Sequence, residues 1–243
     1  MKLSVPIHHL KRRAKLLHRR EQIPLHAALD RIAAAEGYRS WSLLAARQPV
    51  ASAATALNRR LEPGDLVLVA GRPGQGKTLV GLALAAEAAR AGRRSAFFSL
   101  EYTPADVVER LRVLGFESTE LEVFFDLDCS DAISAGYVGT ALASAPFGTL
   151  AVIDYLQLLD YLQLLDQRRD TPELSRQMRD LKALARERGL IIVLLSQVDR
   201  SYDPAAKPFP DITDIRLPNP VDLRLFDKRC FLNGGDIRVE TAA

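Results

Sequence analysis

Residues 65–78, Asp-Leu-Val-Leu-Val-Ala-Gly-Arg-Pro-Gly-Gln-Gly-Lys-Thr, decide the fold. The apolar run 66–70 has the length of a strand and the composition that a parallel sheet buries on both faces. Residues 71–78 match the pattern G-x-x-x-x-G-K-[ST], and the Ala- and Leu-rich residues 79–91 predict a helix. A strand, a glycine loop and a helix in this order predict a phosphate-binding loop. The alternative, a Gly-rich turn with a chance Lys-Thr pair, does not explain why a strand precedes the loop and a helix follows it.

The residue types of this loop suit a triphosphate. Glycines allow the backbone to wrap closely around a phosphate with its N–H groups pointing inward, and the helix N-terminus adds partial positive charge. Lys77 is expected to reach the β- and γ-phosphates, and the hydroxyl of Thr78 is expected to ligate Mg²⁺. The predicted nucleotide-binding residues are Gly71, Arg72, Pro73, Gly74, Gln75, Gly76, Lys77 and Thr78.

Further apolar runs alternate with helical patterns along the chain. This alternation predicts an α/β fold, a mainly parallel sheet flanked by helices, whose ligand lies at the carboxyl ends of the strands. Helical patterns include 133–143 and 174–188, and a terminal β-hairpin is expected from 223–226 and 237–239 around Asn233-Gly234-Gly235. The remaining predicted strands are 95–100, 121–127, 149–154 and 190–195.

The residues before this domain have a different pattern. Short helical patterns predict a small basic helical bundle over residues 1–47. Residues 48–60, with Pro49 and many small side chains, are interpreted as a linker, and residues 61–243 as the domain that contains the phosphate-binding loop.

Charge is distributed unevenly along the chain. The net charge is +3, but residues 1–60 hold twelve Lys and Arg against three Asp and Glu. A basic end on an acidic body favours a polyanion partner such as DNA, and a solvated helix face is the alternative.

Other sequence features restrict the class of protein. No apolar run approaches the ~18 residues that span a bilayer, so no membrane association is expected. Cys129 and Cys230 show no metal-ligand spacing, which fits a reduced, cytoplasmic protein. The four histidines lack the neighbouring Cys or carboxylate ligands of a metal site.

Polar residues end three of the predicted strands. Asp154 follows a strand downstream of the loop and is expected to hold the water shell of Mg²⁺. Glu101 ends the neighbouring strand, where its carboxylate could act as general base for the attacking water, although a surface glutamate before a turn is also common. Gln197 could contact the γ-phosphate and sense its loss.

Three segments with these residues, Ser99-Leu100-Glu101, Ile153-Asp154-Tyr155-Leu156-Gln157-Leu158 and Leu195-Ser196-Gln197-Val198-Asp199-Arg200, resemble successive motifs of the DnaB-type replicative helicase ATPase domain, within the RecA-like group. The resemblance implies a ring-forming, usually hexameric homo-oligomeric ATPase that uses ATP and Mg²⁺ and moves along single-stranded DNA. It also implies that Glu101 is the catalytic carboxylate, Asp154 the Mg²⁺-linked acid and Gln197 the sensor.

The resemblance has a further implication at the C-terminal hairpin. Lys228 and Arg229 look like the family's basic pair that reaches a neighbouring subunit's nucleotide, where positive charge would stabilise the transition state. The family normally separates these two residues by one position, whereas here they are adjacent. Where the family has an N-terminal domain and a linker helix, residues 1–47 are expected to form the small basic bundle instead.

A tandem repeat follows the fourth predicted strand. Asp154-Tyr155-Leu156-Gln157-Leu158-Leu159 is followed by an identical copy at 160–165. Only the first copy directly follows the apolar run 150–153, so Asp154 is assigned and Asp160 is treated as part of an insertion.

Two functions follow from these patterns. The first is an ATP-hydrolysing DNA helicase or DNA-remodelling motor, favoured by the basic N-terminus and by Arg200 beside Gln197. The second is an ATP-dependent switch that signals to a protein partner without unwinding DNA. Since fold does not fix function, stimulation of ATPase activity by DNA is the discriminating measurement.

Overall fold

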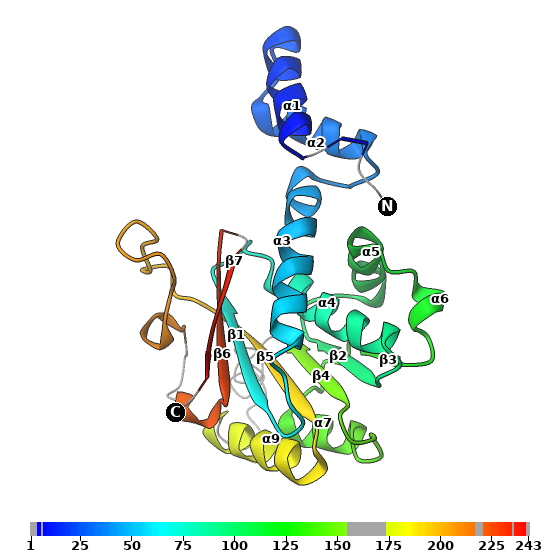
Figure 1. The fold of residues 1–243 in the computed structure, drawn as a ribbon, viewed down its shortest axis with the longest axis vertical. Coiled ribbons are helices and arrows are strands. Elements are labelled where there is room, and N and C mark those ends of the chain that lie inside the picture. Colours follow the sequence, from blue (N-terminus) through cyan, green and yellow to red (C-terminus); the bar gives the residue numbers. More distant parts are fainter. Residues whose placement is uncertain (1–3, 6, 155–173, 217–220, 235, 242–243) are drawn as a thin grey trace.

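The computed structural model describes residues 4–5, 7–154, 174–216, 221–234 and 236–241. Its centre is a seven-stranded sheet with the order β3-β2-β4-β5-β1-β6-β7 (Figure 1). All neighbouring strands pair in parallel except β6 and β7, so the predicted mainly parallel sheet is confirmed. The strands are β1 Leu66–Gly71, β2 Ser95–Ser99, β3 Phe125–Asp128, β4 Leu150–Asp154, β5 Ile191–Gln197, β6 Lys228–Asn233 and β7 Asp236–Thr241.

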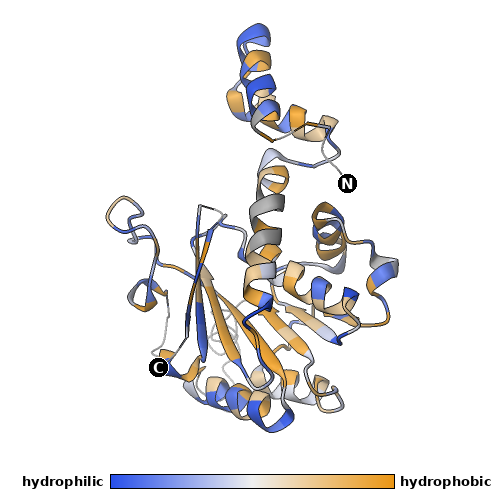
Figure 2. Cartoon of the chain, viewed as in Figure 1, coloured by the Kyte–Doolittle hydropathy of each residue, from blue (hydrophilic) through white to orange (hydrophobic). Residues whose placement is uncertain are grey.

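Helices cover both faces of the sheet. Because side chains alternate across a strand, Val67 and Val69 of β1 pack with α3, α4 and α5, whereas Leu66 and Leu68 pack with α7 and α9. Figure 2 shows the central strands β1, β4 and β5 as a largely apolar layer, whereas parts of the edge strands β6 and β7 are hydrophilic. The helices are α1 Ile7–Glu21, α2 Leu25–Ala35, α3 Trp41–Asn58, α4 Lys77–Arg90, α5 Pro104–Leu114, α6 Ser118–Leu121, α7 Ala135–Ala141 and α9 Leu174–Arg188.

Three predicted boundaries are wrong. The strand expected at 121–127 is shorter, because Leu121 ends the short helix α6 before β3 begins. The helix expected over 133–143 is α7, which begins after the N-cap Ser134. In the terminal hairpin the first strand is β6, whereas Leu223–Leu225 form a 3₁₀ turn capped by the side chain of Asp222.

Helix α3 differs most from the sequence prediction. Residues 48–58 were expected to belong to a linker, but they continue the helix that Ser40 caps, which runs from Trp41 to Asn58. Its buried residues Ala53, Ala54 and Leu57 pack in the same apolar cluster as α4. This packing against the sheet domain stabilises a helix whose composition alone suggested a connector.

The N-terminal helices α1 and α2 pack against each other at the far end of α3, away from the sheet (Figure 1). Leu10 of α1, Ala33 of α2 and Leu44 of α3 form one small apolar cluster with Tyr38 and with Val113 of α5. An exposed ion pair between Arg39 and Glu109, 3.0 Å long, also joins this lobe to α5. None of the helices in the described ranges is long and apolar enough to cross a membrane.

Candidate nucleotide-binding site

The glycine loop connects the carboxyl end of β1 to the N-terminus of α4. Gly74 and Gly76 have φ angles of 77° and 82°, a conformation that glycine adopts without the steric cost of a side chain. Gly76 is the N-cap residue, so α4 begins at Lys77 and its free backbone N–H groups face the loop. The predicted loop therefore has the backbone of an anion site at a helix N-terminus.

Lys77 lies across the mouth of this loop. Its Nζ donates hydrogen bonds to the carbonyl oxygens of Gly71 and Arg72, at 3.0 and 3.2 Å. Burial lowers the pKa of Lys77, and the negative charges of Asp154 and Glu101 oppose that change. The ammonium group of Lys77 therefore lies at the loop, near both predicted acidic residues.

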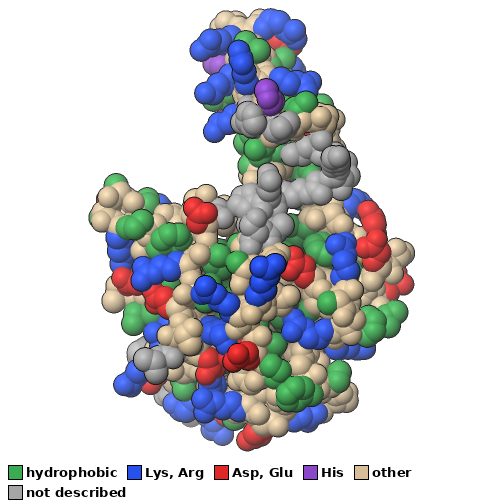
Figure 3. Space-filling model, viewed as in Figure 1, with side chains coloured by type: hydrophobic (Ala, Val, Ile, Leu, Met, Phe, Trp, Pro, Cys, Tyr) green, Lys and Arg blue, Asp and Glu red, His purple; other side chains and the backbone are tan. Residues whose placement is uncertain are grey.

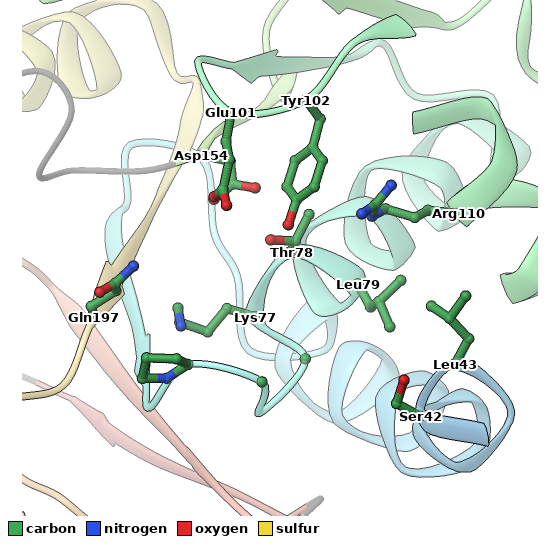
Figure 4. Close-up of a pocket in the computed structure, with 13 residues that line it drawn as sticks. Ser42, Leu43, Lys77, Thr78, Leu79, Glu101, Tyr102, Arg110, Asp154 and Gln197 are labelled. Carbon is green, nitrogen blue, oxygen red and sulfur yellow. The ribbon is translucent and has the colours of Figure 1, made fainter. Parts of the chain in front are cut away.

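The two predicted acids come together at the tips of neighbouring strands. Ser99 of β2 is the register partner of Asp154 of β4, and the N–H of Leu100 donates to the carbonyl oxygen of Asp154 at 3.1 Å. Glu101 follows directly, and Figure 4 shows both carboxylates pointing into the pocket that Lys77 and Thr78 line. Parallel pairing of β2 with β4 produces this juxtaposition.

The carboxyl group of Asp154 is buried and incompletely paired. Only 2% of the residue is exposed, and its Oδ2 is the sole buried side-chain oxygen or nitrogen among the described residues without a hydrogen-bond partner. Burial raises the pKa of Asp154 to about 6, and the nearby Thr78 hydroxyl and Lys77 ammonium oppose this rise. An unpaired buried carboxylate oxygen next to a threonine hydroxyl is the donor set that a hard cation such as Mg²⁺ prefers.

The pocket has a volume of about 360 Å³ and also contains residues that the sequence patterns did not indicate. The guanidinium of Arg110 stacks on the ring of Tyr102, with 3.9 Å between Cζ and the ring centroid. Ser42 and Leu43 enter from α3, beside Leu79 of α4 (Figure 4). Arg110 lies on the turn of α5 that faces the loop, a position that helical periodicity alone does not mark as functional.

Gln197 lies at the end of β5, beside the loop. It is the register partner of Gly71 and lines the same pocket. The hairpin turn after β6 also reaches the loop, because the backbone N–H of Gly234 donates to Oε1 of Gln75 at 2.9 Å. Leu232 of β6 packs closely against Gly71: a Cβ atom added to Gly71 would lie 3.1 Å from the Cβ atom of Leu232.

Lys228 and Arg229 are not part of this pocket. Lys228 pairs with Val67 at the amino end of β1, about 13 Å along the strand from Leu232. Lys228 is buried and forms an ion pair with Asp65, and Arg229 Nε donates to the carbonyl oxygen of Leu223 at 3.1 Å. Within this chain both residues therefore lie away from the pocket, and their contact with a neighbouring subunit's nucleotide stays a prediction. Arg229 lies at the same end of the sheet.

The tandem repeat is described only at its first residue. Asp154 ends β4, as the sequence predicted, and the second copy at 160–165 lies outside the described residues.

Comparison with known proteins gives consistent results. The family model described as "DnaB-like helicase C terminal domain" matches residues 52–120 and 143–221. The replicative DNA helicase DnaB of Synechocystis sp. is 30% identical over 191 residues, which are 66% of this chain and 21% of that protein. That of Pasteurella multocida is 28% identical over 186 residues, 64% of this chain and 39% of that protein. The alignments thus span well under half of these relatives.

Solved structures share the fold. One, described as an ATPase domain, aligns with a TM-score of 0.61 at 21% identity, covering 79% of this chain and 82% of that one. A DnaB-like replicative helicase studied with primase gives a TM-score of 0.59 at 20% identity, covering 77% of this chain and 57% of that one. Both similarities agree with the predicted α/β fold, a mainly parallel sheet flanked by helices. Since the family model covers more than half of the residues and includes the loop and both acidic strand tips, this chain belongs to the DnaB-like helicase C-terminal domain family.

Proposed function

We propose that this protein hydrolyses ATP with Mg²⁺ and uses the reaction to drive a ring-shaped helicase along single-stranded DNA. The observation that supports this most is the convergence of Lys77, Thr78, Glu101 and Asp154 in one pocket, with an unpaired buried oxygen on Asp154. The helicase activity, the DNA substrate and the assembly into a homo-oligomeric ring, such as a hexamer, extend the family relationship to this chain.

Each residue has a role in the proposed reaction. The backbone N–H groups of the loop bind the phosphates, and Lys77 holds the β- and γ-phosphates by charge. Thr78 Oγ1 and the Asp154 carboxylate would hold Mg²⁺, which when bound would neutralise charge on the phosphate oxygens. Glu101, exposed at the pocket mouth, orients a water molecule and accepts its proton during attack on the γ-phosphorus.

Two further residues act beside the reacting atoms. Gln197 lines the same pocket, and in this proposal its amide contacts the γ-phosphate and responds to its loss. The Arg110 guanidinium, held against Tyr102, adds positive charge to the side of the pocket nearest the acids. In this proposal both residues tune the site, whereas Glu101 carries the chemistry. Neither Lys228 nor Arg229 is needed in this pocket.

The experiment is an ATPase titration with the full chain. Phosphate release is measured with Mg²⁺, with EDTA, and with increasing single-stranded DNA, and unwinding of a forked duplex is followed in parallel. We expect Mg²⁺-dependent turnover that rises with DNA. Turnover without any response to DNA would support ATPase activity but exclude the DNA motor, and absence of Mg²⁺-dependent turnover would exclude both.

A further inference from the structure

The N-terminal lobe carries a surface of positive charge outside the nucleotide site. We define the α1 cationic face as the six Lys and Arg side chains of that helix, all of them exposed. Only one acidic residue, Glu21, lies on the same helix. Figure 3 shows these basic side chains gathered on the lobe that projects from the body. The six residues are Lys11, Arg12, Arg13, Lys15, Arg19 and Arg20.

Neighbouring residues neutralise little of this charge. Among the described residues, Arg20 alone of the six forms a salt bridge, with Glu21 at 2.9 Å, and Glu21 is shared with Arg31 of α2. The other acids of the lobe have their own partners, because Asp30 accepts from the N–H of Trp41 and Glu36 accepts from Ser4. The charge on α1 is therefore available to a partner.

The spacing of these charges suits a phosphodiester backbone. Lys11, Lys15 and Arg19 lie four residues apart, so they form one ridge about 12 Å long on the helix surface. Duplex DNA carries one charge per ~1.7 Å of helix axis, so such a ridge meets several phosphates at once. Flexible, exposed cations contact phosphates without reading base sequence.

The same helix does not fit a membrane surface. An interfacial helix needs a free apolar face opposite its charges. In α1 that face is occupied, because Leu10 and Ala14 are fully buried and Leu10 packs against Ile32 and Ala33 of α2. Outside that cluster, Leu16, 59% exposed, lines a small pocket with the half-buried Leu17 and Ile32, and this short patch is not the continuous apolar face of an interfacial helix.

We propose that the α1 cationic face binds the phosphate backbone of nucleic acid, as a sequence-independent contact separate from the ATPase pocket. Residues 1–51 lie outside the segment that the family model matches, so this contact is specific to the lobe rather than part of the matched domain. It would hold DNA at the end of α3, whose first residues line the nucleotide pocket.

The test compares two triple variants of the full chain. The first variant, called the α1 variant, combines the substitutions Lys11→Gln, Lys15→Gln and Arg19→Gln. The matched control replaces three exposed arginines of the body: Arg59→Gln, Arg60→Gln and Arg112→Gln. Both remove three positive charges, and circular dichroism checks that the helices are retained, because glutamine is a good helix former.

Binding is measured by anisotropy with a labelled 30-base-pair duplex and a 30-nucleotide single strand, at several salt concentrations. We expect the α1 variant to bind at least about tenfold more weakly. The plot of log K against log salt should become less steep by about 0.9 for each phosphate contact that is lost. The affinity of the control variant should change less than twofold. Equal affinities for the two variants would overturn the proposal. So would an α1 variant that keeps its DNA affinity but loses binding to vesicles containing phosphatidylserine.

This inference stands apart from the proposed ATPase activity. Lys77→Ala should leave the affinity for duplex DNA unchanged, and the α1 variant should keep the basal turnover measured without DNA. If the unmodified protein shows no turnover, the proposed ATPase activity is disproved. The comparison of the two triple variants would still decide whether α1 binds nucleic acid.

Discussion

The ammonium group of Lys77 donates a hydrogen bond to the carbonyl oxygen of Gly71 at 3.0 Å, so the lysine closes the glycine loop on itself. A bound phosphate would replace these carbonyl partners with a full negative charge. We expect Lys77→Ala to weaken ATP binding by about 10- to 100-fold, the effect of one charge-assisted hydrogen bond. Calorimetric titration with a non-hydrolysable ATP analogue measures this, and an unchanged Kd would contradict the assignment of the loop.

Glu101 is expected to affect turnover rather than binding. Glu101→Gln retains the shape of the side chain but cannot accept a proton, so kcat should fall by about 10²- to 10⁴-fold. The Kd for ATP should stay within about threefold, because Glu101 lies at the mouth of the pocket and not in the loop. Glu109→Gln, on the outer surface of α5, is the control and should leave kcat unchanged. Normal turnover in Glu101→Gln would identify Glu101 as a surface residue.

The negative charge of the buried Asp154 carboxylate is expected to lower the free energy of unfolding when no ligand is bound. Burial raises its pKa from 3.8 to about 6, so above pH 6 the folded state holds a charge that the unfolded chain solvates better. Asp154→Asn should increase the free energy of unfolding by about 1–3 kcal/mol at pH 7.5. Below pH 4 the aspartate is protonated in the folded state, so this gain should disappear.

Urea unfolding of both proteins at pH 7.5 and pH 4, without Mg²⁺ or nucleotide, measures this effect. The same substitution should abolish Mg²⁺-dependent turnover. A variant that is less stable at pH 7.5 would show that the Asp154 carboxylate contributes to folding rather than to metal binding.

Gly81 allows α4 to approach the sheet. A Cβ at this position would lie 2.9 Å from Cγ1 of Val152, closer than real contacts permit. Gly81→Ala should therefore destabilise the protein by about 1–3 kcal/mol, although alanine is the better helix former. Gly136→Ala, on the exposed face of α7 with no atom within 4 Å, is the control and should stabilise by about 0.5–1 kcal/mol. Equal effects at both sites would show that the sheet yields to the extra methyl group.

Lys228 should contribute to folding and not to catalysis. Removing its charge leaves Asp65 buried without its partner, so Lys228→Met should destabilise the protein by about 3–5 kcal/mol. Turnover per folded molecule should stay unchanged. Arg224→Met, which removes an exposed pair with Asp222, should leave the unfolding curve in place. A stable Lys228→Met variant without ATPase activity would support the role in a neighbouring subunit's site that the resemblance implies.

The sequence predicts those parts of the site in which local pattern and function coincide. Residues 66–78 contain strand, loop and helix start in one segment, so their arrangement requires no tertiary information. Glu101 and Asp154 are predictable as a pair because acids that end parallel strands meet at the same edge of a sheet. The order of the strands, with β2 beside β4, then brings the two acids into one pocket.

Other parts depend on tertiary contacts that no local pattern contains. Ser42 and Leu43 reach the pocket only because α3 packs across α4, and α3 is a single helix only because of that packing. The first strand of the hairpin, β6 Lys228–Asn233, begins later than the expected residues 223–226, because the pairing of a hairpin depends on its turn and on the strands that it joins.

The contact between Gln75 and Gly234 has a practical consequence. It joins two residues that are 159 positions apart in sequence, one in the predicted phosphate-binding loop and the other in the last hairpin. The amide resonance of Gly234 should therefore shift when the loop is loaded, which gives a spectroscopic probe of occupancy that leaves every residue of the pocket unaltered.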